Sequence, residues 1–151
     1  MKKICLAILL ICIILGLNNV FAGELKKIQK DELEIGVVLG EPTGLSFKYP
    51  SSKRNSIDFT AGLGSGFIMH FDYLWNDFKA FEVNEGKLPF YYGGGFLVAI
   101  DDKDSEFCIQ GKIGIEYLFE TNPLGIFIEL APAFGTDFIM QAGLGVRYRL
   151  K

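Results

Sequence analysis

Residues 67–76, FIMHFDYLWN, alternate between two kinds of side chain, and this period of two limits the folds open to the chain. Successive side chains of a strand point to opposite faces. One face would therefore collect Phe67, Met69, Phe71, Tyr73 and Trp75, and the other Ile68, His70, Asp72, Leu74 and Asn76. Five large apolar or aromatic groups on one face must be covered, either by a protein core or by lipid. The choice between these two covers decides what kind of protein this is.

The N-terminus has the three-part pattern of a secretory signal peptide. Lys2 and Lys3 precede an apolar run over residues 4–17, and Val20 and Ala22 stand at the positions that a signal peptidase reads. The run is shorter than the roughly 20 residues that a membrane helix needs. We expect residues 1–22 to be a cleaved signal peptide, residues 23–32 to be a short polar lead-in, and residues 33–151 to form one β-barrel domain.

Composition excludes several classes of protein. Loss of Lys2 and Lys3 with the signal peptide leaves 13 basic against 18 acidic residues, and no basic patch indicates nucleic acid as a partner. Cys108 is then the single cysteine, which excludes an intramolecular disulfide and a cysteine-based zinc site. We expect no metal and no cofactor.

Alternation with turn punctuation recurs from residue 33 to the end of the sequence and predicts an all-β fold of about eight strands. The expected strands cover residues 33–40, 45–49, 56–64, 67–76, 88–100, 107–119, 125–135 and 138–150. Residues 41–44, EPTG, have Pro and Gly where a type I turn favours them. The connections are short enough to join antiparallel neighbours, so a meander is the simplest topology.

The strand faces sort in the same way along the chain. One face is bulky and nearly uncharged, and the other carries charged side chains among Gly and Ala. The charged or polar set that we expect inside a barrel is Lys48, Asp58, His70, Asp72, Lys112, Glu116, Glu129, Arg147 and Arg149. An isolated buried ion costs several kcal/mol, so the four carboxylates should pair with the lysines and arginines.

Two barrels fit this alternation. A soluble, lipocalin-like periplasmic barrel would turn the bulky face inward around a lipid or another apolar ligand, whereas an outer-membrane barrel would turn it to lipid. Abundant Gly on the charged face favours the membrane barrel, because a narrow closed barrel needs small residues inside. Aromatic residues near strand ends are typical of interface girdles, and here they include Tyr49, Tyr91 and Phe138. The aromatic residues that we expect to face lipid are Phe67, Phe71, Tyr73, Trp75, Tyr92, Tyr117, Phe119 and Tyr148.

Three segments, LGEPTGLSFKY (39–49), DYLW (72–75) and PLGIFIELAP (123–132), follow the signal peptide in this order. Together they resemble a family of small, functionally uncharacterised bacterial outer-membrane β-barrels, similar in architecture to the transmembrane domain of OmpA and to OmpX. The C-terminal residues QAGLGVRYRLK resemble the strand signal that barrel-assembly machinery recognises. The resemblance implies a membrane barrel whose partners are outer-membrane lipid and that machinery, and it brings no catalytic residue.

Specific catalytic and metal-binding hypotheses have less support in the sequence. His70 is the only histidine, but no serine lies at an evident strand position opposite it, so a structural role is favoured over a general base. Residues 101–106, DDKDSE, lack the glycine and the distal glutamate of a calcium loop. The sequence therefore predicts a closed, antiparallel, up-and-down transmembrane barrel in a bacterial outer membrane, with a structural or membrane-homeostasis role and no catalytic residue.

Overall fold

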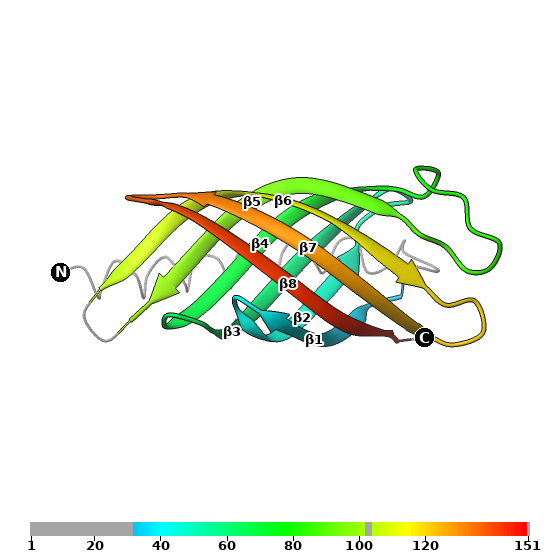
Figure 1. The fold of residues 1–151 in the computed structure, drawn as a ribbon, viewed down its shortest axis with the longest axis horizontal. Helices are drawn as coiled ribbons and strands as arrows, with labels where there is room; N and C mark the ends of the chain where they lie inside the picture. The colour runs from blue at the N-terminus through cyan, green and yellow to red at the C-terminus, as the bar shows by residue number, and fades with distance from the viewer. Residues whose placement is uncertain (1–31, 102–103, 151) are drawn as a thin grey trace. The chain divides into compact units, whose positions relative to one another are not determined.

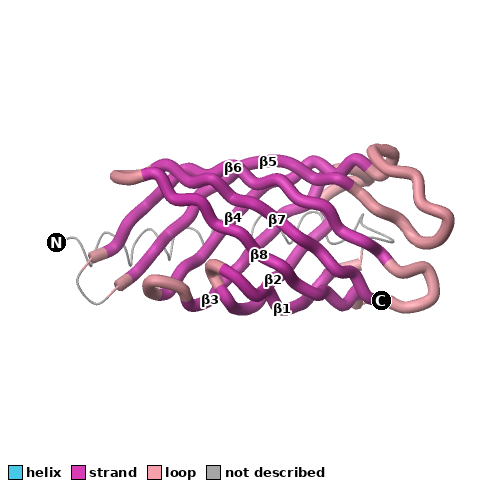
Figure 2. The backbone as a smooth tube through the Cα atoms, viewed as in Figure 1, coloured by secondary structure: helices cyan, strands magenta, loops and turns pink. Residues whose placement is uncertain are grey.

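The computed structural model describes residues 32–101 and 104–150, and these form a unit without helices. The expected signal peptide, and the lead-in up to residue 31, lie outside the described residues. Figures 1 and 2 show the strands wound into one closed barrel.

Eight strands build the barrel wall. They are β1 (Glu34–Gly40), β2 (Thr43–Pro50), β3 (Asn55–Leu63), β4 (Phe67–Asp77), β5 (Phe90–Ile100), β6 (Ser105–Leu118), β7 (Leu124–Phe134) and β8 (Phe138–Arg149). Each strand pairs antiparallel with the next, and β1 pairs with β8 from Glu34↔Arg149 to Gly40↔Gly143. The predicted closed, antiparallel, up-and-down barrel of eight strands is confirmed.

The connection from β1 to β2 is tighter than the predicted four-residue turn. β1 continues to Gly40 and β2 begins at Thr43, so only residues 41–42 lie between them. The Thr43 hydroxyl accepts a hydrogen bond from Gly40 N–H (3.1 Å) and donates one to Gly40 C=O (2.9 Å). Gly40 has a φ of 140°, and a Cβ there would lie 3.1 Å from Gly143 Cα. Both the dihedral angle and the close approach of β8 require glycine.

The two ends of the barrel differ in their connections. One end, called the turn end below, carries residues 41–42, 64–66, 101–104 and 135–137. The other, called the loop end, carries residues 51–54, 78–89 and 119–123, together with the start of β1 and the end of β8 (Figure 1). Lys87 N–H donates to Leu118 C=O (3.0 Å) and Leu118 N–H to Lys87 C=O (2.8 Å), which ties the longest loop to β6.

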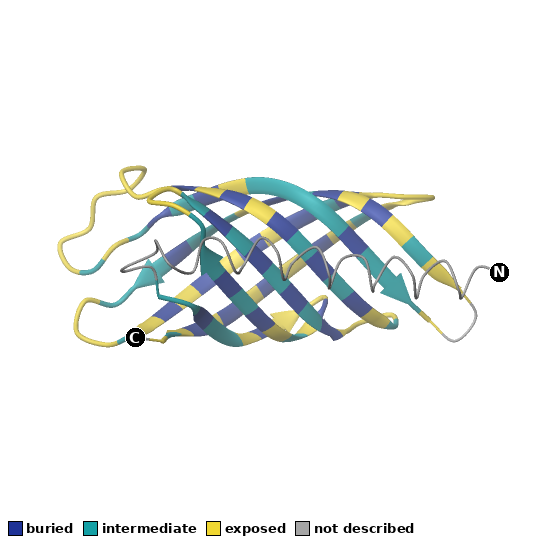
Figure 3. Ribbon diagram, turned by 180° about the vertical axis from the view of Figure 1, so that it is seen from behind, coloured by how far each residue is buried: buried dark blue, intermediate teal, exposed yellow. Residues whose placement is uncertain are grey.

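Burial alternates along the strands, so the wall has an inner and an outer set of side chains (Figure 3). On β7, Phe127, Glu129 and Ala131 are buried, whereas Ile128 and Leu130 between them are exposed. This is the period of two on which the strand predictions depended. It sends the charged set inward and the bulky set outward.

The glycine content of the inner face gives a first prediction. A Cβ on Gly95 of β5 would lie 2.7 Å from Asp72 Cα and 2.8 Å from Asp72 Oδ1. We expect Gly95→Ala to destabilise the barrel by about 1–3 kcal/mol, because β4 must shift to admit the methyl group. The measurement is the midpoint of urea unfolding in detergent micelles, followed by circular dichroism.

Gly111 on β6 provides the matched control. A Cβ there would meet nothing closer than Pro132 Cγ at 3.8 Å. Gly111→Ala should therefore leave the midpoint unchanged or raise it slightly. Equal losses in the two variants would contradict the crowding argument.

Candidate functional site

The predicted interior residues lie inside the barrel, with one exception at its mouth. Those that are buried are Lys48, Asp58, His70, Asp72, Lys112, Glu116, Glu129 and Arg147. They come from β2, β3, β4, β6, β7 and β8, and because each stands at an inward position of its strand they converge on a shared space. Arg149 is half-buried at the loop end.

Lys112 is the centre of the buried ion pairs. Its Nζ lies 2.7 Å from Asp58 Oδ2 on β3, 2.8 Å from Asp72 Oδ2 on β4 and 3.6 Å from Glu129 Oε1 on β7. Gln110 Nε2 donates to both oxygens of Asp72, at 2.7 and 2.8 Å. One cation from β6 is thus surrounded by carboxylates of three other strands.

Arg147 links the same group of carboxylates to β8. Its Nη2 donates to Asp58 Oδ1 (2.8 Å), and its Nε donates to Ser46 Oγ on β2 (3.0 Å). Its Nη1 lies 3.6 Å from Glu116 Oε1. The guanidinium also lies over the ring of Phe127, 3.7 Å from the ring centroid, which is a cation–π geometry.

Lys48 and Tyr91 complete the set on the loop-end side. Lys48 Nζ donates to Glu116 Oε2 (2.6 Å) and lies 4.6 Å from the centroid of the Tyr91 ring. The Tyr91 hydroxyl donates to Glu129 Oε2 (2.9 Å). Tyr91 had been placed among the girdle aromatics, and that prediction is wrong. Tyr91 stands at an inward-facing position of β5, and its side chain is fully buried.

Arg149 does not join the ion pairs expected for it. Its Nη2 donates to the backbone carbonyls of Phe119 (2.7 Å) and Asn122 (3.0 Å) in the loop between β6 and β7. The residue is the last of β8, so its side chain meets the loop at the mouth of the barrel. Arg149 therefore binds backbone where sequence reasoning placed a carboxylate.

His70 is buried at 2% exposure but belongs to none of these ion pairs. The register pairs it with Thr60 on β3, and Gln141 of β8 is a polar neighbour. Neither ring nitrogen has a hydrogen-bond partner of good geometry among the described residues. The Thr60 hydroxyl and the Gln141 amide oxygen also have no hydrogen-bond partner of good geometry among the described residues.

An apolar cluster fills the inner face nearer the turn end. Ile68, Leu97, Cys108 and Ala133 form it, with Ala99 and Ile139 packed against it. Sequence reasoning did not single out this cluster or Phe127, because it read the inner face as charged residues filled out with Gly and Ala. The sequence does indicate an inward Ile68, because it lies on the same face of the predicted strand as His70 and Asp72.

The outer face carries the aromatic set. Phe67, Tyr73, Trp75, Tyr92 and Tyr148 are exposed, and Phe71, Tyr117 and Phe119 are half-exposed. Tyr73 meets Trp75 edge to face at a centroid distance of 5.1 Å, and Trp75 stacks on Tyr92 at 6.0 Å. These contacts join β4 and β5 into a continuous aromatic surface.

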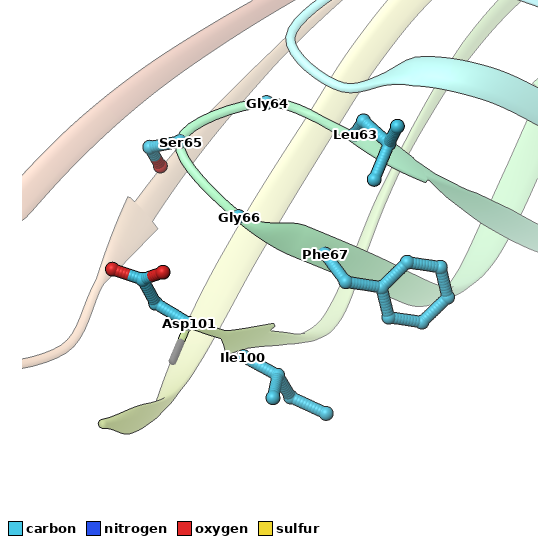
Figure 4. A pocket seen from close by; sticks show the side chains of 7 residues that line it. All are labelled: Leu63, Gly64, Ser65, Gly66, Phe67, Ile100 and Asp101. Carbon is cyan, nitrogen blue, oxygen red and sulfur yellow. The ribbon is translucent and has the colours of Figure 1, made fainter. Parts of the chain in front are cut away.

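An open groove of about 540 Å³ lies at the turn end. It is lined by Leu63, Gly64, Ser65, Gly66, Phe67, Ile100 and Asp101. Leu63, Phe67 and Ile100 form its apolar side, with Ser65 and Asp101 across from them (Figure 4). No buried charged side chain contributes to this groove.

No helix in residues 32–101 and 104–150 is long and apolar enough to cross a membrane. In the same residues, no group of three or more His, Cys, Asp or Glu side chains could hold a metal ion.

Comparison with known proteins identifies the fold. No protein-family model matches the chain, and no curated protein matches it in sequence. Among solved structures, the N-terminal β-barrel domain of Pseudomonas aeruginosa OprF matches with a TM-score of 0.54 and 16% sequence identity. The match covers 80% of this chain and 96% of the OprF domain. The chain has the fold of an OmpA-like small barrel.

Lys112 should be the most sensitive position of the OmpA-like barrel. Lys112→Met would leave three carboxylates in the lumen without their shared cation, so we expect a loss of about 3–5 kcal/mol in unfolding free energy. Urea unfolding in micelles measures it. The exposed Lys53→Met is the control and should change stability by less than about 0.5 kcal/mol.

A double variant tests whether the loss comes from unpaired charge. Lys112→Met with Asp72→Asn removes one cation and one of its carboxylates together, so it should be more stable than Lys112→Met alone. If the second substitution adds its own loss without recovery, the pairing argument fails.

Proposed function

We propose that this chain is an integral outer-membrane β-barrel protein with a structural or membrane-homeostasis role, a side-chain-filled interior and no enzymatic activity. The observation that carries the proposal is the inverted distribution of side chains. Bulky apolar groups cover the outside, and ion pairs occupy the inside.

The outer face supports a lipid environment. Each of the eight strands contributes at least one exposed large apolar side chain, such as Leu39 on β1, Leu45 on β2 and Ile128 on β7. A soluble monomer rarely exposes a contiguous apolar patch larger than a few hundred Å². The lipocalin-like alternative needs the reverse arrangement, with an apolar lumen, and Lys112, Asp58 and Arg147 occupy that lumen instead.

The inner face supports a structural role over a diffusion pore. The ion pairs join strands that are not neighbours, as Lys48–Glu116 joins β2 to β6 and Lys112–Asp58 joins β6 to β3. An eight-stranded barrel is just wide enough for side chains to fill it. Side chains that reach across the lumen in this way leave little room for a solute.

The position of His70 supports a non-enzymatic role. A hydrolase would need a nucleophile beside a base that a substrate can reach. Thr60 is the hydroxyl paired with His70, but both side chains are buried between the apolar cluster and the ion pairs. The turn end also carries only short connections, which offer little for an extracellular partner to grip.

Export and assembly complete the proposal. The signal peptide of residues 1–22 would direct the chain to the periplasm, and the barrel-assembly machinery would recognise β8. Lipid is then the principal partner, and we expect no binding of nucleic acid. β8 carries outward-facing Leu144, Val146 and Tyr148, which are the side chains that such recognition would read.

Trp75 tests the lipid contact directly. It is the sole tryptophan and is 45% exposed near the loop end. In vesicles of brominated phospholipids, its fluorescence should be quenched most strongly when the bromine atoms are attached high on the acyl chains, near the interface. No quenching in a folded chain would count against a membrane barrel.

A shifted tryptophan provides the depth control. In a Trp75→Phe background, Ile128→Trp places the reporter at mid-strand on β7, where the native side chain is 51% exposed. Its strongest quenching should move to bromines deeper in the bilayer. Identical depth profiles for the two proteins would contradict the proposed placement.

The assembly role of β8 has a separate test. Tyr148→Ser removes an outward aromatic group from the last strand, and Tyr117→Ser removes one from β6. We expect both variants to fold unaided into vesicles at similar rates. Only Tyr148→Ser should insert several-fold more slowly in vesicles that contain the purified assembly machinery, and equal slowing in both would contradict recognition of β8.

A further inference from the structure

A layer of buried polar side chains lies between the ion pairs and the apolar cluster. Thr60, His70, Gln110 and Gln141 form it, from β3, β4, β6 and β8, and each is at most 2% exposed. Five of their atoms have no hydrogen-bond partner of good geometry among the described residues, namely Thr60 Oγ1, both ring nitrogens of His70, and Oε1 of both glutamines. A buried polar atom without a partner destabilises the fold. Five at one level need an explanation, and a bound water or ion is one.

The strand register and the contact of Gln110 with Asp72 place these four side chains at one level of the barrel interior. His70 is paired with Thr60, and it stands on the same face of β4 as Asp72, which binds Gln110. On β7, which lies between the strands of the two glutamines, Ala133 is paired with Gln110 and Ala131 with Gln141. Both positions therefore carry only a methyl group beside the glutamines.

The layer offers lone pairs. Gln110 uses its amide nitrogen on both oxygens of Asp72, so its Oε1 is directed away from that carboxylate. An amide oxygen accepts hydrogen bonds or ligates a cation, but it cannot donate. A hydroxyl group can donate its hydrogen, and its oxygen can also accept a hydrogen bond or ligate a cation. Among these five atoms, the donors are the Thr60 hydroxyl and one ring N–H of His70, which lies near enough to Gln141 to hydrogen-bond with it. Four acceptors thus face two donors, so acceptors are left for an outside donor or a cation.

The neighbouring ion pairs lack one positive charge. Among the described residues, the buried cations are Lys48, Lys112 and Arg147, and the buried carboxylates are Glu34, Asp58, Asp72, Glu116 and Glu129. The half-buried Arg149, which the register pairs with Glu34, adds a fourth cation. Four positive charges thus face five negative ones.

We propose that the layer of Thr60, His70, Gln110 and Gln141 binds one small monovalent cation of the Na⁺ or K⁺ class. Hard cations take oxygen ligands, and the oxygens of Thr60, Gln110 and Gln141 supply them. The single charge of the ion equals the charge missing from the ion pairs. The apolar cluster closes the site toward the turn end, and the ion pairs close it toward the loop end. The site does not depend on whether lipid surrounds the barrel.

Thermal unfolding in different salts tests the site. The barrel is unfolded in micelles at equal ionic strength in NaCl, KCl, LiCl or N-methyl-D-glucamine chloride, whose cation is too large to enter. A ligand that binds only the folded state raises the midpoint as its concentration exceeds the dissociation constant. We expect at least one alkali cation to raise the midpoint by about 3 °C or more above the organic cation, with saturation.

Two variants assign the effect to this layer. Gln141→Leu and Thr60→Val each remove one ligand oxygen and should abolish the difference between the salts. Ser56→Ala removes a buried hydroxyl at the loop end, where it accepts from Asn76 Nδ2 (3.0 Å), and should retain the difference.

The possible results separate clearly. Equal midpoints in all four salts would overturn the proposal. The four side chains would then be hydrogen-bonded by water. A difference that persists in both Gln141→Leu and Thr60→Val would also overturn it, because the cation would then bind elsewhere. Should one of these variants fail to fold, the other and the wild-type salt series still decide.

Discussion

The enclosure of Lys112 is the constraint on which the rest of the barrel depends. Its ammonium group has no exposed surface, and a charge in that position persists only when carboxylates surround it. Asp58 supplies one of them and also binds Arg147, so one side chain of β3 connects cations from β6 and β8. Removal of any member leaves its charged partners with one contact fewer in the lumen. The ion pairs therefore act as a unit that fixes which strands face one another.

This unit sets demands on the barrel wall. Ion pairs that span the lumen need inner positions without side chains, and Gly95 beside Asp72 is such a position. Bulk removed from the inner face must lie on the outer face, where Phe71 stacks on Phe96 at a centroid distance of 5.4 Å. The inverted barrel is thus one arrangement in which the small inner residues, the charges and the apolar exterior require each other.

The sequence alone predicted the wall better than its contents. Strand number and side-chain parity follow from a local period of two, so FIMHFDYLWN was enough to place His70 and Asp72 on one face, and the glycines of that face favoured the inside. Parity does not say how far a side chain reaches along or across the lumen. That reach depends on the stagger of the closed barrel, which no single strand encodes. Arg149 was therefore paired with carboxylates when it binds the backbone of a loop.

Interior apolar and aromatic residues were missed for a related reason. Phe127 was overlooked because the inner face was read as charged or small, yet the guanidinium of Arg147 lies over its ring. Tyr91 was assigned to the girdle from its position near a strand end, although its hydroxyl binds Glu129 inside. A buried cation can be held by a π face as well as by a carboxylate. A search for charges alone cannot find such a partner.

The outer face differs between the two ends, and the difference agrees with the proposed membrane placement. The five outward tyrosines and Trp75 all lie toward the loop end, whereas Phe67, Phe107, Phe134 and Phe138 flank the turns of the other end. Tyrosine and tryptophan prefer a boundary where one end of the ring is apolar and the other is wet. Phenylalanine has no polar group that gains from water. In that placement the loop end would lie at a membrane–water boundary, and at the turn end the apolar surface continues up to the turns, so that little more than the turns themselves would project from lipid.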